Sequence, residues 1–221
     1  DQESYYKADF KPGVYQLTDG GIALLPYSSS ELELSARLAY VAGEEFDTMN
    51  LANYFYTIYS SEGSNQEEVA ISLFGLASLG EPILIPLQNF AKLDGLTVKE
   101  KLYIALGAQK IGDSEMAREI YLDVMDAYGE EMGDMYTRLN VGSDKDDYLA
   151  HTSLAAILAG AINDFYHESL WRYVEDNHTK EILINLEKLS YVSASLPNLI
   201  PGQVKFKIKV AGQEIEKTLS K

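Results

Sequence analysis

The sequence contains no cysteine. This absence excludes disulfide bonds, thiolate nucleophiles and zinc sites with cysteine ligands. It leaves the compartment open, because cysteine-free chains occur in the cytosol and also among bacterial surface proteins. The sequence also lacks a long hydrophobic run: the longest, Leu154–Ile162, is far shorter than the ~20 residues that a membrane-spanning helix needs. We therefore expect no membrane insertion.

Basic residues are scarce. The chain has 18 Lys and Arg against 34 Asp and Glu, which gives a net charge of −16. The stretch from Val204 onward carries five Lys and two Glu, a net charge of +3, which leaves −19 for residues 1–203. An acidic surface of this kind repels phosphate groups, so we expect neither nucleic-acid binding nor binding to anionic membranes. The simplest interpretation is that the acidic residues keep a helical surface soluble.

What the sequence has in abundance is helical periodicity, and it is clearest in Thr97–Gly129. Thr97 with Glu100 three residues later predicts a capping box, and Gly112 predicts a break between two helices. The first helix is apolar nearly all round from Leu102 to Ala108, as expected of a helix that is covered on two sides. The second helix has only one apolar face. The segment therefore predicts a hairpin of one inner and one outer helix.

The same pattern recurs along the chain, with Ser28–Ser30 predicted to cap the first helix and Asn65 the third. We predict an all-α fold of about nine helices, an α/α-toroid-like repeat of helical hairpins with irregular period. Residues 130–145 are expected to form an extended connection. The predicted helix pairs are 31–42 with 48–59, 67–79 with 83–90, 98–111 with 115–128, and 146–163 with 168–177, followed by a single helix over 180–194.

Near the C-terminal end the apolar period changes from 3.6 to 2. Val204, Phe206, Ile208 and Val210 alternate with polar residues, which predicts a short antiparallel β-hairpin. We predict a helical domain over residues 1–198, with 1–29 as an irregular lead-in, and a hairpin over 199–221 that is the start of a truncated β module. Because the sequence begins without Met or a signal-like segment, it favours a processed protein or a piece of a longer one.

Two constellations of residues could carry chemistry. Asp144, Asp146 and Asp147 could contribute to a Ca²⁺ site, but the spacing of a calcium loop is absent and helix capping is the favoured role. Asp147 and His151 lie four residues apart and could form an acid–base pair, with capping or surface pairing again favoured. The sequence therefore predicts no catalytic, cofactor-binding or metal-binding residue, and no cofactor.

Aromatic residues form a third candidate. The 16 Tyr residues and Trp171 could line a groove for sugars. Aromatic residues at helical spacing are more often part of a core, and the core interpretation is favoured here.

Three segments resemble the thioester-containing, α/α-toroid region of α2-macroglobulin and complement proteins. These are the Gly-Gly segment within residues 15–40, the polar lead into an Ala-rich helix over 144–160, and the exit segment over 189–206. The chain departs from the family at Ile22, where an aromatic residue is usual, and by lacking the thioester Cys. The reactive element would then lie upstream of Asp1 or be lost, as in some bacterial relatives.

The resemblance implies a non-catalytic scaffold or interaction domain of a secreted or cell-surface multidomain protein. Its partners would be proteins: other domains of the same chain, proteases or surface proteins. Two other hypotheses stay open, a carbohydrate-active α/α-toroid enzyme and a TPR-like adaptor that binds peptides. A closed ring with a packed centre would favour the first hypothesis, an acidic cleft lined with aromatic residues the second, and an open superhelix the third.

Overall fold

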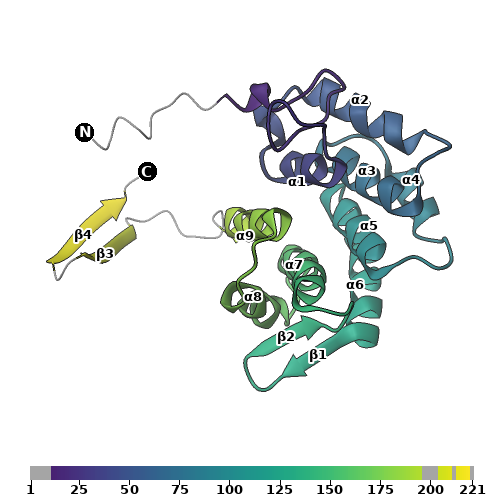
Figure 1. Cartoon of the computed structure of the whole chain (residues 1–221). Coiled ribbons are helices and arrows are strands. Elements are labelled where there is room, and N and C mark those ends of the chain that lie inside the picture. The colour runs from purple at the N-terminus through teal and green to yellow at the C-terminus, as the bar shows by residue number, and fades with distance from the viewer. Residues whose placement is uncertain (1–10, 196–203, 211–212, 220–221) are drawn as a thin grey trace.

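A computed structural model describes residues 11–195, 204–210 and 213–219 of the chain (Figure 1). These residues form nine α-helices, two short 3₁₀ helices and two antiparallel two-stranded sheets, which confirms the helical class and the C-terminal hairpin. Membership of the toroid family stays a prediction. The helices are α1 (Leu32–Ala42), α2 (Thr48–Tyr59), α3 (Gln66–Ser78), α4 (Leu84–Phe90), α5 (Val98–Lys110), α6 (Ser114–Tyr128), α7 (Lys145–Ala161), α8 (His167–Asp176) and α9 (Ile182–Ser195).

The odd-numbered helices, here called the inner helices, contact one another in chain order from α1 to α9. Helix α9 also contacts α1, so the five inner helices form a closed cycle of contacts (Figure 1). Most even-numbered helices bridge two inner ones: α2 packs on α1 and α3, α4 on α3 and α5, and α6 on α5 and α7. Helix α8 packs on α7 and on strand β2 (Tyr136–Leu139). The alternation of inner and outer helices agrees with the sequence pattern.

Burial explains this alternation. In the inner helix α5 every residue from Leu102 to Ala108 is buried, because neighbours cover it on several sides. In the outer helix α6 only Ala117, Tyr121 and Val124 are buried, which leaves a polar outer face. The core is therefore continuous through the inner helices and ends at the single apolar face of each outer helix.

Among the described residues, five helix starts have a side-chain cap, whereas α1, α4 and α8 begin without one. Asn65 and Thr97 cap α3 and α5 through capping boxes, as predicted. The predicted cap at Ser28–Ser30 is wrong, since α1 follows Glu31 without a side-chain cap. Ser28 and Ser30 serve the lead-in loop instead: the Ser30 hydroxyl donates to the Asp19 carboxylate, and the Ser28 hydroxyl donates to a backbone carbonyl.

The turn at Asp19-Gly20-Gly21 is a close approach of the lead-in to α2. The Asp19 carboxylate accepts a hydrogen bond from the Gly21 N–H. Gly20 has φ +90°, and a Cβ there would lie 2.1 Å from the Asn50 carbonyl oxygen. A Cβ at Gly21 would lie 2.7 Å from the ring of Tyr54. Only glycine fits at both positions, so the Gly-Gly pair sets how the lead-in packs.

A hairpin of β1 (Gly129–Met132) and β2 interrupts the stretch that was expected to be an extended connection. The pairing of these strands was not predicted, because they are short and mostly polar and no alternation of apolar residues marks them. Long-range contacts hold the hairpin: the Leu139 N–H donates to the Thr152 hydroxyl of α7, and Thr137 hydrogen-bonds Ser169 of α8.

The second hairpin pairs β3 (Val204–Val210) with β4 (Gln213–Leu219). Its register places Lys207 opposite Glu216 and Lys209 opposite Glu214, which suits the predicted alternation of charged and apolar positions. The predicted domain boundary between residues 198 and 199 lies outside the described residues.

Candidate functional site

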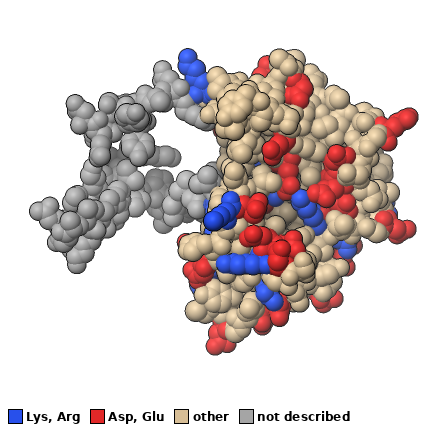
Figure 2. Space-filling view, in the orientation of Figure 1, with Lys and Arg blue, Asp and Glu red and all other residues tan. Residues whose placement is uncertain are grey.

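The first turns of the inner helices meet at one end of the molecule. Lys99 at the start of α5 donates to Glu33 of α1 over 2.9 Å and to Glu67 of α3 over 2.8 Å. A recess of about 310 Å³ opens beside them, and we call it the N-terminal recess. Figure 2 shows acidic and basic side chains gathered in the middle of the face around α7 and α9. The charged or titratable residues lining the recess are Glu33, Arg37, Lys99, Asp146, Asp147, His151 and Glu181.

Arg37 lies beneath this recess and connects the first inner helix to the last. Its guanidinium donates to the Glu33 carboxylate over 2.6 Å and forms an ion pair with Glu187 of α9. The side chains of Arg37 and Glu187 are only 5% and 2% exposed. Because an unpaired charge at such depth is strongly unfavourable, the two side chains must stay together. The pair therefore holds α9 against α1 and keeps the helical cycle closed.

Tyr103 completes the network from α5. Its hydroxyl donates to the Glu33 carboxylate over 2.6 Å, and the Arg37 guanidinium lies 5.6 Å from the centre of its ring. The Tyr103 ring also packs on Phe74 of α3, with ring centres 5.2 Å apart. Side chains from α1, α3, α5 and α9 thus meet in one network.

Two buried polar atoms of this network, Arg37 Nε and Glu187 Oε2, have no hydrogen-bond partner in the described part of the chain.

The electrostatics of the network fix its protonation. Burial raises the pKa of Glu33, but the charges of Arg37 and Lys99 and the Tyr103 hydroxyl outweigh burial and hold it at about 2. Burial lowers the pKa of Lys99, whereas the carboxylates of Glu33 and Glu67 raise it by more. Burial raises the pKa of Tyr103 well above its ordinary value. Near neutral pH, Glu33 is therefore ionised and Tyr103 is protonated.

A group with such a pKa is a poor proton donor or acceptor in catalysis, which works best when the pKa lies near the working pH. The arrangement is better suited to holding α1, α5 and α9 together than to chemistry on a substrate.

The three acidic residues considered for Ca²⁺ each have a partner within the protein. The Asp144 carboxylate accepts the Asp147 N–H and caps α7, and the Asp146 carboxylate accepts from the Thr179 hydroxyl. The Asp147 carboxylate accepts from the Ser143 N–H. Among the described residues, no group of three or more His, Cys, Asp or Glu side chains could hold a metal ion. Capping therefore explains Asp144, whereas Asp146 and Asp147 accept from residues outside α7.

The hypothesis of an acid–base pair between Asp147 and His151 is wrong. The hydrogen-bond partner of His151 Nδ1 is the backbone carbonyl oxygen of Asp147, at 2.8 Å, and not the Asp147 carboxylate. The backbone N–H of Ser143 lowers the pKa of the Asp147 carboxyl. The Asp147 carboxylate accepts from the backbone N–H and the hydroxyl of Ser143, in the turn before α7.

Trp171 takes part in packing. Its ring stacks on Tyr191 of α9 with centres 3.9 Å apart and an angle of 9°, and both rings pack against the core. This favours the core interpretation over a sugar groove.

The sequence analysis missed Arg37, Glu187 and Tyr103. A signal was present for the charged pair, since Arg37 lies three residues after Leu34 and Glu187 three residues after Ile184, on buried helix faces. A charge at a core position predicts a buried partner, although it does not say which residue that partner is.

Among the helices that the structure describes, none has both the length and the apolar character needed to cross a membrane. No family model matches the chain, and no match was found among curated proteins or solved structures.

Proposed function

We propose that the chain is a non-catalytic scaffold or interaction domain of a secreted or cell-surface multidomain protein that resembles α2-macroglobulin. The observation that supports this most is the buried ion pair of Arg37 and Glu187, which joins the first and last inner helices. This cycle joins its inner helices α1, α3, α5 and α9 through one network of side chains. Its outer helices then remain as the surfaces on which other domains or proteins can dock.

The two alternative functions have less support. A peptide-binding adaptor of the TPR kind needs an open superhelix with a concave groove, whereas α9 contacts α1 here. A glycosidase needs one carboxyl with a raised pKa facing a second carboxylate. Glu33 and Asp147, the carboxyls at the N-terminal recess whose pKa is shifted, are both shifted downward.

The test is to sequence the parent gene on both sides of this chain and to fractionate the cells that express it. We expect a signal peptide, flanking β modules and a Gly-Cys-Gly-Glu-Gln segment upstream of Asp1, with the protein in the secreted or surface fraction. The intact parent protein is then mixed with a protease, and covalent or trapped adducts are sought on denaturing and native gels. A reading frame that ends near Asp1 and Lys221, or a protein confined to the cell interior, would overturn the proposal.

A further inference from the structure

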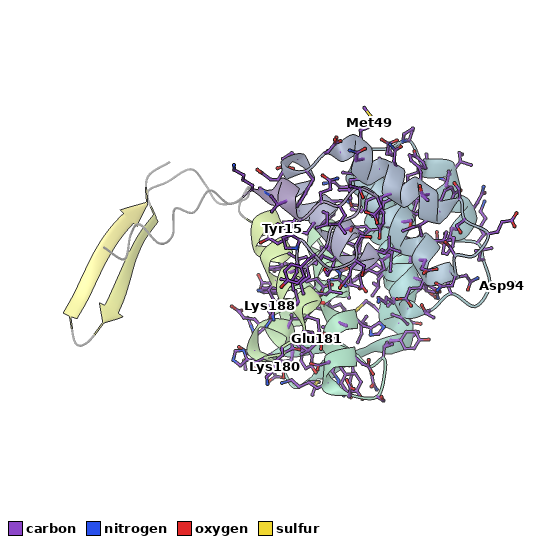
Figure 3. The ribbon with its side chains drawn as sticks, turned by 45° about the horizontal axis from the view of Figure 1, so that its top comes forward. Tyr15, Met49, Asp94, Lys180, Glu181 and Lys188 are labelled. Atoms are coloured by element: carbon purple, nitrogen blue, oxygen red, sulfur yellow. The ribbon has the colours of Figure 1, made fainter. Side chains whose placement is uncertain are left out.

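A groove of about 1060 Å³ lies on the outer side of the helical body, between the loop that follows α4 and the outer helix α6. Its apolar lining residues include Leu96, Ile104, Met116 and Ile120. Asp94 lies in the loop between α4 and α5, at the outer edge of the body (Figure 3). The acidic residues along the groove are Asp94, Asp113, Glu115, Glu119 and Asp123.

Helix α6 presents two parallel rows to this groove. Glu115, Glu119 and Asp123 recur every four residues and form an acidic row. Met116 and Ile120 form an apolar row beside it, and both are partly buried against the core. Glu115 lies in the first turn of α6, where a negative charge stabilises the helix, but like charges four residues apart weaken an isolated helix slightly, so helix stability does not explain Glu119.

Acidic residues outnumber basic ones along the groove, which Lys92 and Lys101 also line, and part of the negative charge has no ion-pair partner in the described part of the chain. Asp123 pairs with Lys101 over 2.6 Å, and Asp113 is used as the cap of α6. Asp94, Glu115 and Glu119 form no ion pair with any described residue. The basic residue of α6, Arg118, donates instead to the Ile162 carbonyl at the end of α7. The charges on this helix are therefore segregated, with the acids along the groove.

We propose that this groove binds a basic amphipathic helix of a protein partner. Such a helix carries leucine-like residues every three to four positions, which would cover the apolar row, and lysines beside them, which would face the unpaired carboxylates. The acidic row from Glu115 to Asp123 extends along α6 for ~12 Å, or about two helical turns, so a short segment suffices. The inference gives a partner class to the interaction role proposed above and rests on that role.

The experiment uses the full chain and a fluorescein-labelled 14-residue peptide of Leu and Lys, with Leu at i, i+3, i+4 and i+7. Binding is measured by fluorescence anisotropy at physiological salt. We expect saturable binding to the wild-type chain. A peptide of the same composition in scrambled order should bind at least about tenfold more weakly, because it presents no continuous apolar face.

Two matched double variants separate the groove from the overall charge. Glu115→Lys with Glu119→Lys reverses the acidic row, and Glu44→Lys with Glu62→Lys makes the same charge change at exposed residues elsewhere. We expect the first to raise the Kd at least about tenfold, and the second less than about twofold. Met116→Gln, which keeps the size and helix preference of the residue, should raise the Kd severalfold. Circular dichroism checks that each variant stays folded.

Equal weakening by both double variants would mean that the peptide senses net charge alone and would overturn the groove proposal. So would the absence of binding to the wild-type chain. Neither result touches the scaffold role, which the flanking gene sequence and the cell fractionation test separately.

Discussion

The two ends of the inner helices differ in how their polar groups find hydrogen-bond and ion-pair partners. At the C-terminal ends of α3, α5 and α7 the backbone provides most of these partners, and at α7 the side chains of Gln109 and Arg118 also donate to the Ala161 and Ile162 carbonyls. Each helix is followed by a residue of positive φ, which is Gly80, Gly112 or Asn163. The next residue then donates its N–H to the carbonyl five positions earlier, as Asp113 does to Ala108. This Schellman motif is local and needs no neighbouring helix.

At the N-terminal ends, side chains from different helices complete one another. Lys99 of α5 lies between carboxylates of α1 and α3, and Arg37 of α1 pairs with Glu187 of α9. The C-terminal ends therefore depend mainly on local sequence, with added contacts at α7, whereas the N-terminal ends combine local caps with ion pairs between helices. A substitution in the ion pairs at the N-terminal end should therefore destabilise the packing of several helices, whereas one in a C-terminal turn should destabilise that turn alone.

The largest effect is expected for Arg37→Met, which keeps an apolar stem but leaves Glu187 buried without its cation. Breaking a buried pair on one side costs about 3–5 kcal/mol, and we expect a loss of unfolding free energy of that size. The measurement is urea denaturation at neutral pH. A loss below about 1 kcal/mol would show that the pair does not hold α9 to α1.

The matched control is Arg37→Met combined with Glu187→Leu. It removes both buried charges and fills their space with apolar atoms, so it should recover most of the stability lost in the single variant. Failure of the double variant to recover would assign the loss to packing around the Arg37 stem and its contact with Tyr103.

The second prediction concerns acid. Since the pKa of Glu33 is about 2 in the folded chain against an ordinary 4.5, the unfolded chain binds more protons between those values. The ionised Glu33 carboxylate therefore contributes fully to the free energy of unfolding above pH 4.5, and this contribution is lost as the pH falls toward 2. The difference amounts to about 3 kcal/mol. Urea denaturation from pH 5 to 2.5 should show a shallower fall for Glu33→Gln, and parallel curves for the two proteins would contradict the role of Glu33.

The difference between local and long-range interactions also explains how much of the structure could be predicted from the sequence. Features that a few neighbouring residues determine were predicted well: the capping boxes of Asn65 and Thr97, the break at Gly112, and most helix bounds within a residue or two. They depend on local hydrogen bonds and on periodicity, both of which are visible in one segment at a time.

The rest depends on residues that are far apart in the chain. Glu187 lies 150 positions after Arg37, and no local pattern connects them. The Asp147–His151 hypothesis failed for the opposite reason, because correct helical spacing cannot show that a turn already occupies the carboxylate. The β1–β2 hairpin was missed because its anchors lie on α7 and α8. Contacts of this kind become visible only when the helices are assembled.

A smaller effect is expected at the other end of the inner helices. Gly112 has φ +95°, and a Cβ there would meet no atom within 4 Å, so Gly112→Ala carries conformational strain and no clash. We expect a loss of about 1 kcal/mol in urea denaturation. Gly13→Ala is the control, since a Cβ there also meets nothing and its φ is not positive. An equal loss in both variants would contradict the assignment of strain to the left-handed backbone.

The smallest effect is expected for Glu67→Gln, although Glu67 belongs to the same network as Arg37. Its side chain is 47% exposed and reaches Lys99, which keeps Glu33 as a second partner. An exposed pair of this kind contributes about 0.5 kcal/mol or less, and salt screens it. Urea denaturation in low salt and in 1 M salt should show the small difference shrinking, whereas the loss in Arg37→Met should persist because water and ions do not reach its partner. A loss as large as that of Arg37→Met would mean that the network acts as one unit, and that burial does not separate its inner pair from its outer one.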